Sequence, residues 1–83
     1  MVYDIIWTAP AERQLRKLDR SVGKRIFEAV EELAEDPFRR VLRLVNSPYY
    51  RLRVGDYRVI IDLQEGKLLV LVLLMGHRKN IYK

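Results

Sequence analysis

Three arginines lie close together on two adjacent segments in the last third of the chain. Arg51 and Arg53 alternate with apolar residues in YYRLRV, and Arg58 follows in YRVIIDL. The Gly55-Asp56 pair between these segments is typical of the two-residue turn of a type II′ β-hairpin. Counting outward from that turn places Arg53 directly opposite Arg58, on the same face. Because like charges held side by side repel each other, the pattern favours an anion between them, and a phosphate is the obvious candidate.

The composition indicates a small basic domain. The chain has 83 residues, 49% of them hydrophobic, and its 16 Lys and Arg against 11 Asp and Glu give a net charge of +5. This length holds one small core, so we expect a single domain over residues 1–83. The positive charge, with a pI near 9.8, favours nucleic acid or an acidic protein as the partner. The lack of cysteine and the single histidine exclude a thiolate or His-rich zinc site, and we expect neither a metal nor a cofactor.

The N-terminal segment MVYDIIWTAP lacks the pattern of a signal peptide, because it carries Asp4 and has no basic stretch ahead of its apolar run. The longest apolar run, residues 68–75, is eight residues long. A membrane-spanning helix needs roughly 20. We therefore expect a cytoplasmic protein that does not bind a membrane.

The first half of the chain is predicted to form a strand followed by a helical hairpin. Residues 2–7 are mostly β-branched or aromatic, as in a strand, and Thr8 can cap a helix over about residues 9–18. Apolar residues at helical spacing indicate a second helix over about residues 22–33, which Asp36-Pro37 ends. This half of the chain is therefore expected to form a layer that packs on strands supplied by the second half.

The second half is predicted to form three strands, over about residues 49–54, 57–64 and 67–75, the last apolar on both faces. Residues 38–48 lack a period and are predicted to be a loop with a short extended stretch around residues 42–45. The order β-α-α-β-β-β predicts an α+β fold, with the helical hairpin on one face of a mainly antiparallel four-stranded sheet. Strand alternation turns one set of residues towards the helices and leaves the arginines on the opposite face. The set facing the helices is Tyr50, Leu52, Val54, Tyr57, Val59 and Ile61.

Three stretches, taken in order, resemble a known family. They are RLRVGDYRVI, the apolar strand that follows it, and GHRKNIY near the end of the chain. Together with the N-terminal strand and the two helices, they resemble the RelE/ParE superfamily of bacterial and archaeal toxins from toxin–antitoxin pairs. The resemblance covers essentially the whole chain and implies a RelE-like toxin domain.

The resemblance implies an mRNA interferase of the RelE type, a ribonuclease that enters the ribosomal decoding site and cleaves mRNA there without a metal. The 2′-hydroxyl of the RNA attacks the adjacent phosphate, which leaves a cyclic phosphate and a 5′-hydroxyl. The implied partners are the ribosome, its mRNA, and a cognate antitoxin, an acidic or amphipathic chain that wraps the toxin.

The resemblance also implies roles for individual residues. The family's basic residues on the second strand correspond to Arg51 and Arg53, its third-strand arginine to Arg58, and its later arginine and tyrosine to Arg78 and Tyr82. A phosphorane-like transition state carries extra negative charge, which fixed guanidinium groups stabilise more than they stabilise the ground state. Arg58 and Arg78 are expected to do this, while Arg51 and Arg53 hold the reacting or flanking phosphates.

Proton transfer needs another group, because arginine stays charged. One candidate is His77, and the other is Tyr82, whose ordinary pKa of about 10 the neighbouring Arg78 and Lys79 would lower. Either residue can act as general base or general acid. Tyr49 is a candidate for stacking on a base, or else for covering the sheet.

Two other functions fit the same sequence. A ParE-type toxin is not an enzyme and inhibits DNA gyrase or another topoisomerase through protein contacts, and its fold would be the same. The chain is also compatible with an antitoxin-binding module of little activity. The close spacing of the arginines and Tyr82 favours RNA cleavage.

Overall fold

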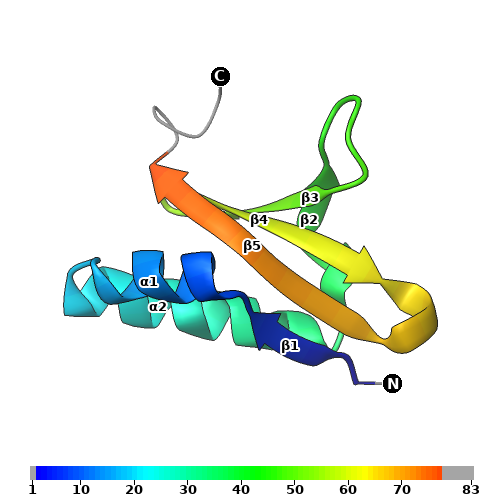
Figure 1. Ribbon diagram of the computed structural model, residues 1–83, viewed down its shortest axis with the longest axis horizontal. Helices are drawn as coiled ribbons and strands as arrows, with labels where there is room; N and C mark the ends of the chain where they lie inside the picture. Colours follow the sequence, from blue (N-terminus) through cyan, green and yellow to red (C-terminus); the bar gives the residue numbers. More distant parts are fainter. Residues whose placement is uncertain (1, 78–83) are drawn as a thin grey trace.

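A five-stranded mixed sheet with two helices on one face is formed by residues 2–77, which are the residues that the computed structural model describes (Figure 1). In chain order the elements are β1 Asp4–Trp7, α1 Ala9–Arg16, α2 Arg20–Glu31, the 3-10 turns η1 Glu32–Ala34 and η2 Pro37–Arg39, β2 Val41–Arg43, β3 Tyr50–Val54, β4 Tyr57–Gln64, the 3-10 turn η3 Glu65–Lys67, and β5 Leu69–His77. The strand order is β1-β5-β4-β3-β2. β1 runs parallel to β5, and every other neighbouring pair is antiparallel. The predicted α+β fold is confirmed.

The predicted number of strands was wrong by one, because residues 41–43 form a short edge strand. β2 pairs with β3 through Val41 opposite Leu52 and Leu42 opposite Arg51. Val41 is buried and Leu42 is 61% exposed, so the strand alternates as an edge strand does. Three residues are too few to show a period in the sequence, and this strand exists through its pairing with β3.

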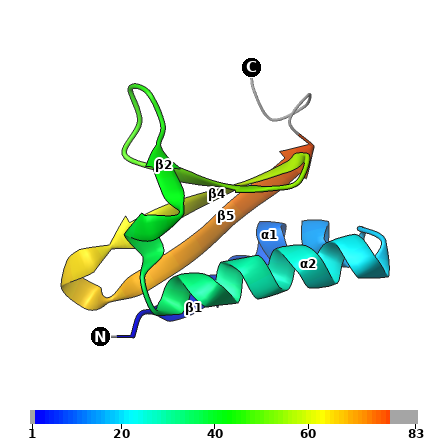
Figure 2. The same ribbon diagram turned by 180° about the vertical axis from the view of Figure 1, so that it is seen from behind.

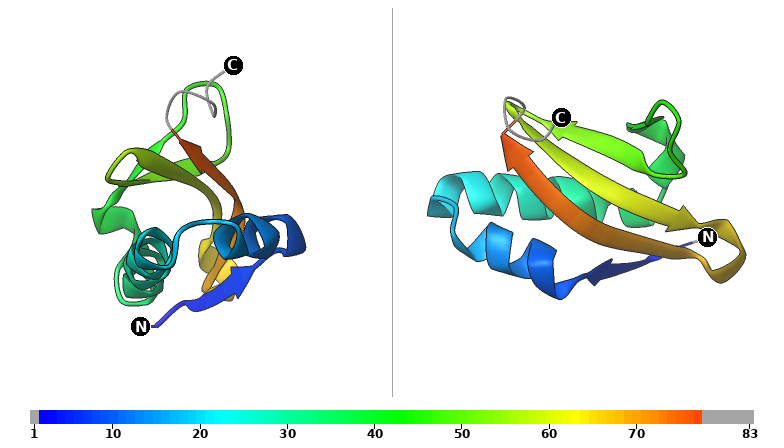
Figure 3. Two further views of the ribbon diagram at one scale, coloured as in Figure 1. Left: turned by 90° about the vertical axis from the view of Figure 1, so that its left-hand side faces the viewer. Right: turned by 45° about the horizontal axis from the view of Figure 1, so that its top comes forward.

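The helical hairpin packs on one face of the sheet, as predicted. Figure 2 shows α2 running beneath the strands, and the end-on view in Figure 3 shows both helices on one side of the curved sheet. α1 ends at Arg16, two residues before the predicted end, because the N–H groups of Lys17 and Leu18 bond three residues back, to Gln14 and Leu15. Among residues 2–77, no helix is long and apolar enough to cross a membrane.

The core lies between the helices and the face of the sheet that is turned towards them, here called the inner face. Its buried residues are Ala11, Ile26, Val30 and Leu33 from the helical layer and Val41, Leu52, Val54, Val59, Ile61, Val70, Val72 and Met75 from the strands. Tyr50 and Tyr57 pack against this cluster and are half-buried. The predicted inward-facing set of β3 and β4 is therefore confirmed.

A β-bulge in β5 changes the alternation of its last residues. Ile60 pairs with Leu74 and Ile61 with Val72, so Leu73 is an extra residue without a partner position on β4. The Thr8 hydroxyl donates to the carbonyl oxygens of Val72 at 2.6 Å and Leu73 at 3.2 Å. The expected capping of α1 by this hydroxyl does not occur. The side chain of Thr8 instead stabilises the bulge through these two hydrogen bonds, at the point where β1 stops pairing with β5.

Candidate nucleic-acid interface

The β3–β4 hairpin holds its arginines in the predicted register. Arg53 lies opposite Arg58, and Arg51 lies opposite Ile60. Gly55 has φ +59° while Asp56 keeps a negative φ, which is the pattern of a type II′ turn. The turn and the ladder place the two arginines directly opposite each other on neighbouring strands, so the predicted pairing of Arg53 with Arg58 is confirmed.

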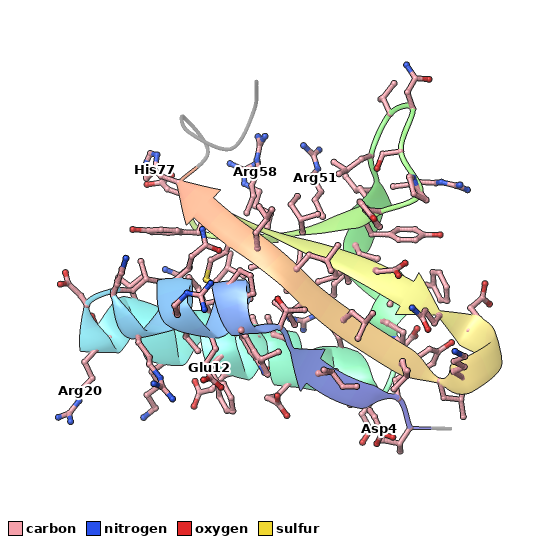
Figure 4. All side chains as sticks on the ribbon, in the orientation of Figure 1. Asp4, Glu12, Arg20, Arg51, Arg58 and His77 are labelled. Carbon is pink, nitrogen blue, oxygen red and sulfur yellow. The ribbon has the colours of Figure 1, made fainter. Side chains whose placement is uncertain are left out.

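These arginines occupy the face of the sheet turned away from the helices, here called the outer face and defined by Arg51, Arg53, Arg58, Ile60 and Leu74. Figure 4 shows Arg51 and Arg58 pointing away from both helices, and the right-hand view of Figure 3 shows no helix in front of β3, β4 and β5. Arg53 is exposed, while Arg51 and Arg58 are half-buried. Among residues 2–77, no helix covers these three cations.

Two rows of paired residues cross the outer face. The first runs from Arg53 through Arg58 to Gly76, so β5 places no side chain beside Arg58. The second runs from Arg51 through Ile60 to Leu74, and Leu74 is 41% exposed. The face thus offers arginines on β3 and β4 together with the partly exposed, apolar Leu74 on β5, a combination that suits the phosphates and the bases of a nucleotide chain.

His77 lies at the end of β5, opposite Tyr57 in the ladder. Their rings meet edge to face with centroids 5.7 Å apart. Paired residues share a face, so His77 is on the side of Tyr57, whereas Arg58 is on the side of Gly76. Figure 4 nevertheless places His77 at the same end of the sheet as Arg58. His77 thus borders the arginines from the rim of the sheet.

The other predicted site residues lie beside β3 or beyond β5. Tyr49 directly precedes β3 and is 39% exposed, and its backbone N–H donates to the Ser47 hydroxyl at 3.1 Å. Arg78 and Tyr82 lie outside the described residues, in the segment that follows His77 in sequence. Their roles stay predictions.

A feature that the sequence did not indicate is a hollow of about 520 Å³ between α2 and β3. Its charged lining consists of Arg25, Arg40 and Arg53 together with Glu28 and Glu32. Arg40 pairs with Glu32 at 2.9 Å. Because cations and carboxylates are mixed, this hollow is less suited to an anion than the outer face.

Elsewhere among residues 2–77, no three His, Asp or Glu side chains lie close enough together to hold a metal ion.

Comparison with known families identifies the class of protein that this fold and face belong to. The profile of the family described as "ParE toxin of type II toxin-antitoxin system, parDE" matches residues 5–82. The chain belongs to this family and is a toxin of the RelE/ParE superfamily. The predicted superfamily is confirmed.

Individual relatives are similar over nearly their whole length. The chain is 29% identical to Toxin RelG of Mycobacterium tuberculosis, over 100% of this chain and 99% of that protein. It is similar to the RelBE2 toxin–antitoxin complex of the same organism, with a TM-score of 0.83 and 26% identity over 94% of this chain and 100% of that one. The RelE–RelB complex of the archaeon Pyrococcus horikoshii also gives 0.83, with 25% identity over 96% and 99% of the two chains. These matches confirm the RelE-like fold.

Proposed function

We propose that this toxin is an endoribonuclease that cleaves mRNA on the ribosome without a metal. The observation that carries the proposal is the pairing of Arg53 with Arg58 on a sheet face that no helix covers. Two arginines that lie opposite each other on neighbouring strands repel each other, and a phosphate bound between them would relieve that repulsion. Toxin RelG and the RelE toxins, to which the chain is similar, support this class of function.

In the proposed reaction, the 2′-hydroxyl oxygen of the RNA forms a bond to the adjacent phosphorus, and the bond from phosphorus to the 5′-oxygen breaks. The products are a cyclic phosphate and a 5′-hydroxyl. Arg58 and the predicted Arg78 stabilise the charge that grows on the phosphate oxygens, while Arg51 and Arg53 bind the reacting or flanking phosphates. The sheet holds the backbones of Arg51, Arg53 and Arg58 in register before the reaction, which reduces the reorganisation that binding a phosphate requires.

Two protons must move in this reaction, one from the attacking hydroxyl and one to the leaving oxygen. His77 and Tyr82 are the candidates, since no arginine can exchange a proton under these conditions. His77 lies one residue beyond Gly76, the partner of Arg58, and at the same end of the sheet as Arg58, although its ring packs on Tyr57. We propose that these two residues share the roles of general base and general acid.

The proposed partners are the ribosome, its mRNA and a cognate antitoxin. The relatives from M. tuberculosis and P. horikoshii form complexes with their antitoxins. A net charge of +5 and exposed apolar residues such as Leu74 suit an acidic or amphipathic antitoxin. We place this activity in the cytoplasm, where ribosomes translate mRNA.

The test is to mix the purified toxin with ribosomes programmed with a defined mRNA and to map the ends of the RNA. We expect fragments that end in a cyclic phosphate, and we expect Arg58→Ala combined with Arg78→Ala to abolish them. Arg16→Ala is the control, because Arg16 lies on α1 and pairs with Glu12. Intact message with the wild-type toxin would refute the proposal.

A ParE-type inhibitor of DNA topoisomerase is the second candidate, because the matching family is described by the name ParE. The two functions leave different lesions in cells. Arrested translation with cleaved message supports the endonuclease. DNA damage with intact message supports the inhibitor.

A further inference from the structure

A second pair of like charges lies on α1 and at the residue that directly follows it. Arg13 and Lys17 are four residues apart, so their side chains share one side of the helix, where like charges repel. Within residues 2–77, neither makes an ion pair. Arg16, which lies between them in sequence, pairs with Glu12 at 3.1 Å. Arg16 is therefore neutralised within the protein, whereas the charges of Arg13 and Lys17 have no carboxylate partner among residues 2–77.

Arg13 and Lys17 line a hollow of about 420 Å³ between α1 and β5. The rest of the lining is Pro10, Gln14, Leu73 and Leu74, so the hollow contains cations, an amide and apolar groups but no carboxylate. This differs from the hollow beside α2, where Glu28 and Glu32 accompany the arginines. The hollow on α1 is thus the more favourable place for an anion.

The hollow is built by the bulge of β5. β1 pairs with β5 only as far as Val72, and the edge of β5 beyond that point faces α1. The side-chain oxygen of Gln14 accepts a hydrogen bond from the N–H of Met75 at 2.8 Å. This bond fixes α1 against the edge of β5 and sets Arg13 and Lys17 beside Leu73 and Leu74.

The hollow continues the outer face. Leu74, which lines it, is the last member of the row that begins at Arg51 and passes through Ile60. β3 and β5 are two strand spacings apart, roughly 10 Å. A single phosphate cannot bridge that distance, so Arg51 and the cations beside Leu74 cannot bind the same phosphate.

We propose that Arg13 and Lys17 bind a phosphate of the RNA strand next to the nucleotides held by the outer-face arginines, with Leu74 in contact with the nucleotide between them. This rests on the proposed function in one respect, that RNA is the ligand of the outer face. An RNA strand fits because phosphates recur along it while its bases offer apolar surface to Leu74. The hollow thereby extends the RNA site from the scissile linkage to a neighbouring phosphate.

The test measures the salt dependence of binding to a single-stranded RNA oligonucleotide whose 2′-O-methyl sugars prevent cleavage, by fluorescence anisotropy. Each phosphate neutralised on a single strand contributes about 0.7 to the slope of log K against log salt concentration. The double variant Arg13→Ala/Lys17→Ala should flatten the slope by about 0.7 to 1.4, for one or two contacts. Arg16→Ala should leave the slope unchanged, and thermal unfolding should show that all three proteins are folded.

An unchanged slope in the double variant, or no binding of the oligonucleotide by the wild-type toxin at low salt, would overturn the proposal. So would a double variant that binds RNA normally but loses its antitoxin, since the hollow would then belong to an acidic protein segment. The slope and the ribosomal cleavage assay are independent of each other. Cleavage with an unchanged slope removes only the hollow from the RNA site, and a flattened slope without cleavage removes only the nuclease.

Discussion

The inner and outer faces of the sheet are built from the same strands and are held in place by different means. On the inner face, Leu52, Val59 and Ile61 are at most 3% exposed and pack under the helices. On the outer face, Arg53 and Arg58 alternate with those residues, and no helix within residues 2–77 covers them. Packing of the inner face therefore also fixes the spacing between the arginines of the outer face, because the same hydrogen-bonded backbone carries both sets of residues.

The largest expected effect is on stability, from truncation of the inner face. Ile61→Ala removes a side chain that is 0% exposed, and we expect a loss of about 2–5 kcal/mol in the free energy of unfolding, measured by urea denaturation. Leu42→Ala is the control, because Leu42 is 61% exposed, and it should cost less than about 1 kcal/mol. Equal losses in the two variants would break the distinction between the faces.

The next effect is on activity, from removal of a cation of the outer face. Arg58→Ala should lower the single-turnover rate of mRNA cleavage on programmed ribosomes by about 10²- to 10³-fold, as the loss of one oxyanion donor does. The midpoint of thermal unfolding should change little, because the half-buried Arg58 lies outside the core cluster. A variant that keeps its rate but unfolds easily would make Arg58 a structural residue.

A smaller effect concerns the turn that aligns the two faces. Gly55→Ala places a side chain at φ +59° with its Cβ 3.3 Å from Arg25 Nη1, so it should cost about 1–2 kcal/mol of unfolding free energy. Gly66→Ala is the matched control, since its φ is not positive and no atom lies within 4 Å of the added Cβ. Chemical denaturation of both variants measures the difference, and equal stabilities would show that this turn does not constrain the hairpin.

The smallest effect has the opposite sign. Arg53→Ala relieves the repulsion between opposed arginines and should stabilise the free toxin by about 0.2–1 kcal/mol while weakening its binding to RNA. Arg51→Ala serves as the comparison, because Arg51 faces Ile60 and its removal relieves no such pair. Thermal unfolding and RNA anisotropy measure both quantities. A destabilised Arg53→Ala protein would mean that the opposed cations already have an internal compensation.

The hairpin and the inner face could be predicted because their signals are local. The Gly55-Asp56 turn sets the register, and alternation then assigns each residue of β3 and β4 to a face. The RelE-like fold followed from the order of the elements together with the family resemblance. Both signals are contained in short stretches of sequence, so the outer-face arginines could be predicted from the sequence.

The remaining features depend on contacts between residues far apart in the chain. β2 forms because β3 offers it an edge to pair with. In the bulged part of β5, the backbone is hydrogen-bonded by the side chains of Thr8 and Gln14, which lie more than sixty positions away in the sequence. A threonine before a helix is ordinarily expected to cap it, and nothing near it in sequence indicates a bulge. The hollow beside Arg13 and Lys17 follows from the same contacts, so nothing near these residues in sequence indicates it.

The most direct test of the central claim is a structure of the toxin on a ribosome programmed with mRNA whose 2′-O-methyl sugars prevent cleavage. We expect the scissile phosphate to lie between the guanidinium groups of Arg53 and Arg58, within hydrogen-bond distance of both. An mRNA that contacts the helical side of the toxin, or passes the outer face without a phosphate between these two arginines, would contradict the account.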